Sequence, residues 1–301
     1  MVTMTILDKV RNRTARVRQH RWRMRPYRST ERHIVIGGSP RSGTTLLRRI
    51  LDQHPGLCCG PEMNLFIPFR FELEPLAVLS GIPRQELAAM FRASPSQGAL
   101  IDAVGTRYRR LRGKPRWVEK TPRNVRHFGW VLERFPEARL IHVIRDGRDV
   151  ACSSAEHPDR RWVAGRWVWQ LHPRPVADHA RAWVTDTSAG MRFRGDARYQ
   201  EVRYEDLVAR PEETLRELCA FIGEPFDAAL LQRPGDRAEG GARSADAGGI
   251  SPGGAPAPGS PDRGPVFTSS IGRWRRDLAG LELQEVLRIC GSRLRELGYS
   301  D

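Results

Sequence analysis

The chain has 301 residues, of which 40% are hydrophobic and 28% are charged, so it is long enough to bury one sizeable core. This composition excludes a collagen-like or globally disordered chain, and because no run of 18 apolar residues occurs we expect no membrane span. The formal net charge is +15, from 50 Lys and Arg against 35 Asp and Glu, which points to an anionic ligand or partner.

The N-terminal residues 1–32 carry ten basic and two acidic side chains, which accounts for +8 of the net charge. They show no sustained helical stripe of large apolar residues. We therefore predict a mobile arm that is either solvated or bound to acidic lipid or nucleic acid. The segment lacks the apolar run of a secretory signal, and the five cysteines show no CxxC spacing, so we expect reduced thiols and a cytoplasmic protein.

A strand, a loop and a helix are predicted next. The short apolar run 33–36 leads into the glycine-containing residues 37–45, and apolar residues then recur with helical spacing as far as residue 54. Further strands are expected at 140–144 and at 202–204, and helices at 211–222 and 281–297. Strands that alternate with helices predict an α/β fold: a P-loop-like parallel sheet flanked by helices in three layers, with ligands at the carboxyl ends of the strands.

A second change in composition occurs at residues 234–264, which contain nine glycines and five prolines. Such a segment cannot bury enough apolar surface to offset its ordering entropy, so we predict a flexible insert or lid. The predicted organisation is an N-terminal arm, 1–32, and one domain, 33–301, that contains this insert.

The glycine loop has the chemistry of a phosphate site, because backbone N–H groups and the positive end of the following helix converge on one anion. Gly38 and Gly43 have the spacing of a Walker A loop, but Thr44 stands where that loop carries its lysine. This argues against ATP hydrolysis. A cation, Arg41, stands inside the loop instead.

Residues 40–45, Pro-Arg-Ser-Gly-Thr-Thr, resemble the 5′-phosphosulfate loop of sulfotransferases that use 3′-phosphoadenosine 5′-phosphosulfate (PAPS). The resemblance is strongest to the tyrosylprotein and bacterial branch, and it covers about residues 33–230 and 265–300. It implies that PAPS is the co-substrate. Because a sulfuryl group carries less charge than a phosphoryl group, side-chain cations and backbone donors can neutralise the transition state, so we expect that no metal is required. The donor-binding residues that the resemblance implies are Arg41, Ser42, Gly43, Thr44 and Thr45 in the loop, the 3′-phosphate pair Arg145 and Ser153, and Tyr204 and Arg273.

The same resemblance implies three catalytic roles. Arg41 would stabilise the bridging oxygen of the donor and Lys120 the sulfuryl oxygens, while Glu62 would act as the base for the acceptor proton. A histidine base, His127 or His142, is the rival. Glu62 could instead be a surface or helix-capping carboxylate, and Lys120 could serve only in a salt bridge to Glu119 or Glu62.

The sequence departs from the family at a disulfide. The tyrosylprotein enzymes pair a cysteine at the position of Cys59 with one that corresponds here to Val118, so we expect no such bond. The acceptor that the resemblance implies is a hydroxyl, and we expect it to belong to a sugar, phenol, lipid or peptide tyrosine. Trp162, Trp167, Trp169 and Trp183 either line its pocket or pack in the core. Two other functions stay open: a P-loop nucleotide kinase, and a non-catalytic module that binds a nucleotide or polyanion.

Overall fold

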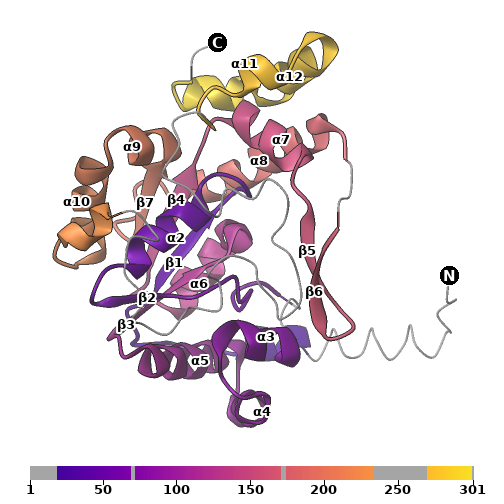
Figure 1. The fold of residues 1–301 in the computed structure, drawn as a ribbon. Helices are drawn as coiled ribbons and strands as arrows, with labels where there is room; N and C mark the ends of the chain where they lie inside the picture. Colours follow the sequence, from indigo (N-terminus) through magenta and orange to yellow (C-terminus); the bar gives the residue numbers. More distant parts are fainter. Residues whose placement is uncertain (1–18, 69–71, 171–173, 233–269, 300–301) are drawn as a thin grey trace, which may run out of the picture.

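The computed structural model describes residues 19–68, 72–170, 174–232 and 270–299. A five-stranded sheet lies at the centre, and all its strand pairs are parallel, in the order β2-β3-β1-β4-β7 (Figure 1). The strands are β1 (Ile34–Gly38), β2 (Leu57–Cys59), β3 (Arg116–Lys120), β4 (Arg139–Ile144) and β7 (Tyr199–Arg203). With helices on both faces of this sheet, the predicted three-layer α/β fold is confirmed.

The central strand β1 carries no polar side chain because both faces of the sheet are covered. In β1, Ile34 and Ile36 pack on one face, while Val35 between them packs on the other. The neighbouring strand β3 follows the same alternation, with Val118 on the first face and Trp117 on the second. This alternation decides on which side of the sheet each polar residue at a strand end emerges.

The first face is covered by the helices that follow β1 and β7 and by the helical segments that come after the second of these. They are α2 (Thr44–Asp52), α9 (Tyr204–Ala209), α10 (Pro211–Ile222) and the short 3₁₀ helix η2 (Ala228–Leu231). Pro211 occupies the first turn of α10, where no intrahelical N–H bond is lost, and Gly223 ends the helix in the left-handed conformation with φ 72°. Both of these helix boundaries agree with the sequence prediction.

The second face is covered by a larger helical layer. Its elements are α3 (Leu73–Ser80), α4 (Arg84–Ala93), α5 (Gln97–Arg112), the 3₁₀ helix η1 (Pro122–His127) and α6 (Phe128–Arg134). A third apolar cluster joins α7 (Gly147–Ala155), α8 (Val176–Met191), α11 (Trp274–Asp277) and α12 (Gly280–Glu296). None of the helices in the described part of the chain is both long and apolar enough to span a membrane.

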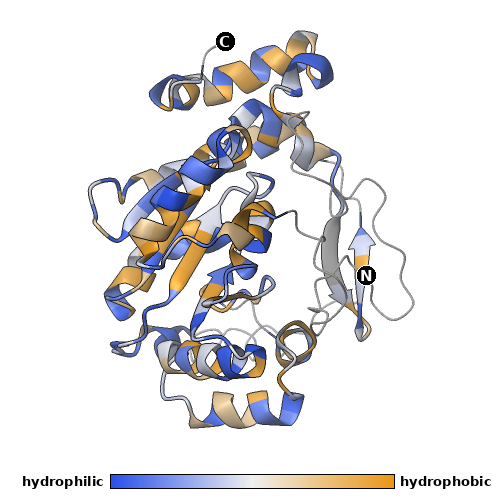
Figure 2. Cartoon of the chain, turned by 60° about the vertical axis from the view of Figure 1, so that its left-hand side comes forward, coloured by the Kyte–Doolittle hydropathy of each residue, from blue (hydrophilic) through white to orange (hydrophobic). Residues whose placement is uncertain are grey.

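An antiparallel hairpin, which the sequence analysis did not predict, stands beside the main sheet (Figures 1 and 2). It consists of β5 (Asp159–Val163) and β6 (Arg166–Gln170), joined at Ala164 and Gly165, which both have positive φ. Two consecutive residues with positive φ between two strands are typical of a tight hairpin turn, and glycine at the second position is a sequence signal for such a turn. The hairpin separates the four tryptophans: Trp162 and Trp167 pack edge to face on it and Trp169 lies on β6. Trp183 is a fully buried core residue.

Within the predicted N-terminal arm, residues 22–29 pack on the helical layer. The indole of Trp22 lies 5.1 Å from the ring of Phe91, and the guanidinium of Arg23 stacks 3.9 Å above Trp130. Asp102 accepts hydrogen bonds from Tyr27 (2.5 Å) and Ser29 (2.6 Å). Aromatic stacking and a half-buried carboxylate thus hold a segment whose composition suggested mobility. Residues 1–18 and the insert 234–264 lie outside the described residues.

Candidate active site

The polar residues singled out by sequence lie at one edge of the sheet. The loop after β1, Lys120 at the end of β3, Arg145 after β4 and Tyr204 after β7 all follow strand carboxyl ends. Because the strands are parallel, these ends meet at the same edge. Four separate segments of the sequence therefore contribute polar side chains to the edge of the sheet where a ligand was predicted to bind.

The loop between β1 and α2 is tightly folded. The N–H of Ser42 donates to the carbonyl of Ser39 (3.1 Å), and Arg41 adopts a positive φ of 71°. Gly43 has a φ of 96°, and a Cβ atom there would lie 2.4 Å from Cδ2 of Tyr204, so only glycine fits. Thr44 and Thr45 open α2, whose first backbone N–H groups have no intrahelical acceptor.

Two buried donors at this edge lack a hydrogen-bond partner within the described ranges. They are Oγ of Ser42, in a residue that is 0% exposed, and Nε of Arg145, in a residue that is 5% exposed. Buried polar groups are nearly always hydrogen-bonded, so unpartnered donors call for an explanation. Together with the helix N-terminus they form a cradle that suits an anion.

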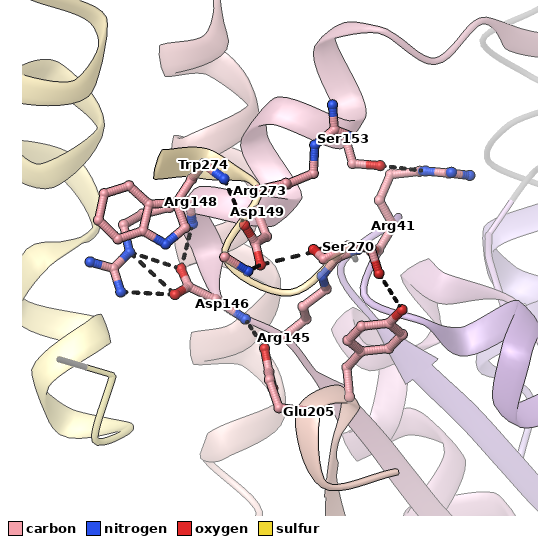
Figure 3. Close-up of polar contacts among 12 residues, drawn as sticks. Arg41, Arg145, Asp146, Arg148, Asp149, Ser153, Glu205, Ser270, Arg273 and Trp274 are labelled. Carbon is pink, nitrogen blue, oxygen red and sulfur yellow. Dashed lines mark hydrogen bonds and ion pairs between the residues drawn. The ribbon is translucent and has the colours of Figure 1, made fainter. Parts of the chain in front are cut away.

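Arg145 joins the loop to the start of α9 (Figure 3). Its Nη1 donates to the carbonyl oxygen of Arg41 (3.2 Å), and its guanidinium lies 4.5 Å above the ring of Tyr204. The Nε of Arg41 in turn donates to Oγ of Ser153 on α7 (3.2 Å). Four of the residues predicted to bind the donor, Arg41, Arg145, Ser153 and Tyr204, therefore form one cluster.

A C-terminal segment closes the cluster, and Asp149 holds it there. The carboxylate of Asp149 accepts the N–H groups of Gly272 (2.8 Å) and Trp274 (3.0 Å), and it lies 3.7 Å from Arg145 Nη2. Burial raises the pKa of Asp149. The backbone of Arg273 consequently lies near Arg145. Its guanidinium, however, pairs with Asp277 (2.5 Å) and with Glu156 (2.7 Å).

Sequence reasoning missed Ser270. Its hydroxyl lies 2.6 Å from the hydroxyl of Tyr204, and its carbonyl oxygen accepts a hydrogen bond from Arg145. The residue directly follows the undescribed range 233–269, which interrupts any fixed spacing from Tyr204. The only local signal is the short string from Ser270 to Trp274, in which Arg273 was identified but Ser270 was not.

Lys120 and Glu62 form the second centre of the site. Nζ of Lys120 lies 2.6 Å from Oε1 of Glu62 and 3.3 Å from Oγ1 of Thr45, so the lysine connects the base candidate to the phosphate loop. Only 2% of the Lys120 side chain is exposed, against 46% of Glu62. Of the two salt-bridge partners considered for Lys120, the structure pairs it with Glu62, whereas Glu119 bonds to other residues.

Burial favours the neutral form of the two histidines considered as rival bases. His142 is fully buried on β4, where its Nδ1 lies 2.6 Å from the hydroxyl of Tyr199. Burial lowers the pKa of His142 to about 4. Burial, with the nearby charge of Arg23, also lowers the pKa of His127 to about 4. The contacts thus favour Glu62 over either histidine.

The cysteines agree with the prediction of free thiols. Cys58, Cys59, Cys152, Cys219 and Cys290 are all buried and unbonded to one another. Cys59 on β2 is the direct register partner of Val118 on β3. The two positions that the resembling enzymes join by a disulfide are therefore adjacent here, with valine in place of the second cysteine.

Comparisons with known proteins place this geometry in context. A family model described as "Sulfotransferase family" matches residues 33–228. A protein-tyrosine sulfotransferase of Drosophila melanogaster is 28% identical over 212 residues, which cover 66% of this chain but only 39% of that protein. The sulfotransferase domain of the Synechococcus PCC 7002 olefin synthase aligns with a TM-score of 0.56 at 23% identity, over 89% of this chain and 96% of that domain. Mouse sulfotransferase SULT7A1 complexed with PAP aligns with a TM-score of 0.52 at 15% identity, over 90% and 88% of the two chains.

Proposed function

Because this chain belongs to the sulfotransferase family, we propose that it transfers a sulfuryl group from PAPS to the hydroxyl of an acceptor. The observation that carries the proposal is the convergence of Arg41, Arg145, Ser153 and Tyr204 on one strand-end site, beside the ion pair of Lys120 with Glu62. The first group is suited to hold a doubly phosphorylated nucleotide, and the second to act on the transferred group and the acceptor.

The proposed donor fits the residues present. The loop 41–45 would hold the 5′-phosphosulfate with backbone N–H groups, and the unpartnered Oγ of Ser42 would donate to the same anion. Arg145 and Ser153 would hold the 3′-phosphate, for which Nε of Arg145 is available. Ser270 and Arg273 would border this end of the nucleotide, and the mouse relative was solved in complex with PAP.

Three side chains would carry the chemistry. PAPS supplies an activated sulfuryl group whose bond to the bridging phosphate oxygen breaks as the acceptor oxygen attacks the sulfur in line. Arg41 would stabilise the charge that develops on that bridging oxygen, and Lys120 the charge on the sulfuryl oxygens. Glu62 would take the acceptor proton. The products are the sulfated acceptor and adenosine 3′,5′-bisphosphate, and since these cations can neutralise the developing charge we propose that the reaction needs no metal.

The ion pair in the present structure constrains this mechanism. Oε1 of Glu62 is 2.6 Å from Nζ of Lys120, so a Glu62 that accepts a proton must use its other oxygen or leave the lysine. Because Glu62 is half-exposed and Lys120 is buried, the mobile partner is Glu62. We infer that Glu62 moves away from the lysine when the donor binds, which leaves Lys120 in place to act on the sulfuryl oxygens and frees Glu62 to receive the proton.

The acceptor is proposed by class. Any hydroxyl that reaches Glu62 meets the chemical requirement, whether of a sugar, phenol, lipid or peptide tyrosine. The name of the fruit-fly relative favours peptide tyrosine, although the match spans only 39% of that protein. Trp162, Trp167 and Trp169 on the hairpin provide aromatic surface that would suit such a ring.

Two functions remain as alternatives, a P-loop kinase and a nucleotide- or polyanion-binding module. Isothermal titration calorimetry with adenosine 3′,5′-bisphosphate, and separately with ATP and magnesium, distinguishes them. We expect metal-independent binding of the bisphosphate and a preference for it over ATP. Labelled PAPS incubated with carbohydrate, phenolic, lipid and tyrosine-peptide acceptors should then yield one labelled product class. Preference for ATP with magnesium would support the kinase, and nucleotide binding without transfer to any class would support the module.

A further inference from the structure

A buried carboxylate lies behind the proposed catalytic pair and has no part in the mechanism above. Glu119 is the residue before Lys120 on β3, and none of its surface is exposed. Its neighbours on the strand, Val118 and Lys120, emerge on the other face of the sheet. Burying a carboxylate is costly unless hydrogen bonds satisfy it, so its partners show what it does.

Each oxygen of Glu119 receives one hydrogen bond. Oε1 accepts from the hydroxyl of Thr121 at 2.7 Å, and Oε2 accepts from Nδ2 of Asn124. Asn124 also donates to the carbonyl of Ile36 in the middle of β1. The carboxylate thereby fixes the chain directly after β3, where Lys120 is attached, against the strand that leads into the phosphate loop.

The bond to Thr121 continues toward the proposed base. A hydroxyl has one proton, and while Thr121 donates it to Glu119, the oxygen of Thr121 accepts the backbone N–H of Asn64 at 3.3 Å. Asn64 adopts a positive φ of 57°, and its side-chain amide donates to the carbonyl of Glu62 at 3.1 Å. The turn that presents Glu62 is thus attached, through Thr121, to a carboxylate on the opposite face of the sheet.

We propose that Glu119 is a positioning residue whose ionised carboxylate orients Thr121 and so places Glu62 beside Lys120. This inference rests on the proposed function, because it assigns a role to Glu119 in the reaction of that same site. An ionised Glu119 can only accept hydrogen bonds, which forces the proton of Thr121 toward it and leaves the threonine oxygen for Asn64. A protonated Glu119 removes that constraint, and the turn that holds Glu62 loosens.

The electrostatic surroundings put this change in the physiological range. Burial raises the pKa of Glu119 to about 7, opposed by the hydrogen bonds from Thr121 and Asn124. The charged groups that act on it are Lys120, which lowers its pKa, and Glu62, which raises it. Turnover at saturating donor and acceptor should therefore rise as pH increases through about 7.

The first test replaces Thr121, which leaves the buried charge in place. Thr121→Val removes the hydroxyl and keeps the shape, and we expect kcat to fall by about 10-fold to 100-fold. Thr121→Ser keeps the hydroxyl and should stay within about threefold of wild type. Calorimetry with adenosine 3′,5′-bisphosphate should give dissociation constants within about threefold of one another for wild type and both variants. Neither substitution alters the residues proposed to bind the nucleotide. A folded Thr121→Val protein with wild-type kcat would overturn the inference.

The second test follows the pH profile of kcat in Glu119→Gln, whose side chain is neutral at every pH. We expect this variant to turn over at the low wild-type level of about pH 6 throughout, without the rise near neutrality. Glu201→Gln is the matched control, because Glu201 is also a largely buried carboxylate on this sheet, but it bonds to Arg194 and Tyr199. A merely structural role for Glu119 would lower the melting temperature and leave the pH profile unchanged, and that result would contradict the proposal.

These experiments distinguish failure of the positioning role of Glu119 from failure of the proposed function. If wild type transfers sulfuryl groups and Thr121→Val and Glu119→Gln behave as wild type does, the positioning role is wrong and the proposed function stands. If wild type binds the bisphosphate but transfers nothing to any acceptor class, the proposed function fails, and the role of Glu119 fails with it.

Discussion

Nζ of Lys120 lies 2.6 Å from Oε1 of Glu62, although only 2% of the lysine side chain is exposed against 46% of the glutamate side chain. A buried ammonium whose carboxylate partner reaches solvent forms an asymmetric pair. The charge of the lysine is fixed by the fold, whereas the glutamate can leave without a large desolvation cost. The arrangement suits a resting state in which the proposed base, Glu62, is paired with Lys120 until the donor binds.

Glu62→Gln should therefore separate binding from chemistry. The amide can still accept a hydrogen bond from Lys120 but cannot take a proton, so we expect kcat to fall by about 100-fold or more. Affinity for adenosine 3′,5′-bisphosphate should change by less than about threefold, since within the described residues the hydrogen bonds of Glu62 are to Lys120 and Asn64. Initial rates with labelled PAPS and calorimetry measure the two quantities. Glu133→Gln, at a carboxylate whose side chain is 69% exposed, is the control. Unchanged turnover in Glu62→Gln would exclude Glu62 as the base.

The proposed contact of Arg145 with the 3′-phosphate can be tested by comparing wild type and a variant with two nucleotides that differ only in that phosphate. Arg145→Ala should weaken binding of adenosine 3′,5′-bisphosphate by about 10-fold to 100-fold, the size expected for a lost charged hydrogen bond. Binding of adenosine 5′-monophosphate, which lacks the 3′-phosphate, should change much less. Arg84→Ala, at a residue with a 60% exposed side chain, controls for the loss of one positive charge. Equal weakening of both nucleotides would show that Arg145 supports the loop and does not clamp the 3′-phosphate.

Gly43→Ala should damage the phosphate loop through a specific collision. The new Cβ would lie 2.4 Å from the ring of Tyr204, in addition to the strain of a φ of 96°. We expect a loss of about 2–3 kcal/mol in the free energy of unfolding and weaker nucleotide binding. Gly81→Ala is the matched control, because Gly81 has a φ of 69° and nothing within 4 Å of the added atom. Chemical denaturation of both variants should show the larger loss for Gly43→Ala, and similar losses would mean that backbone strain alone decides the effect.

His142 should make stability depend on pH. Burial lowers its pKa from 6.5 to about 4, so the folded protein resists a proton that the unfolded chain accepts. The contribution of His142 is thus fully present above about pH 6.5 and is lost as pH falls toward 4. Between about pH 7.5 and 5, wild type should lose about 2 kcal/mol more than His142→Asn, which does not titrate. Urea denaturation at the two pH values gives this difference, and parallel losses in both proteins would show that His142 can be protonated without unfolding.

The packing of residues 22–29 predicts a difference between two deletions. Removing residues 1–28 eliminates the stacking of Arg23 on Trp130 and the bond from Tyr27 to Asp102, whereas removing residues 1–18 leaves both. The longer deletion should therefore unfold at least about 2 kcal/mol more easily than the shorter one. Melting temperatures measured side by side test this, and equal values would mean that residues 19–28 contribute nothing to stability.

Local motifs made much of the site predictable from the sequence. The loop residues 41–45, together with Arg145 and Tyr204, each follow a strand within a few positions, and a parallel sheet brings such positions to one edge whatever the details of packing. The hairpin was missed because its signal is only the pair Ala164 and Gly165. The packing of residues 22–29 was missed because an arginine-rich composition does not reveal that Trp130 is available to stack on Arg23.

The sequence by itself predicted the fold class and the glycine loop, because these depend on residue type and on short spacings along the chain. Its resemblance to a known family gave the proposed roles of Arg145, Ser153, Lys120 and Glu62. Only the tertiary structure decided which carboxylate Lys120 pairs with, where the side chain of Arg273 points, and that Glu119 is attached through Thr121 to the turn that holds Glu62. The physical reason is that successive strand residues emerge on opposite faces of the sheet, so partners are set by how distant segments pack around each face.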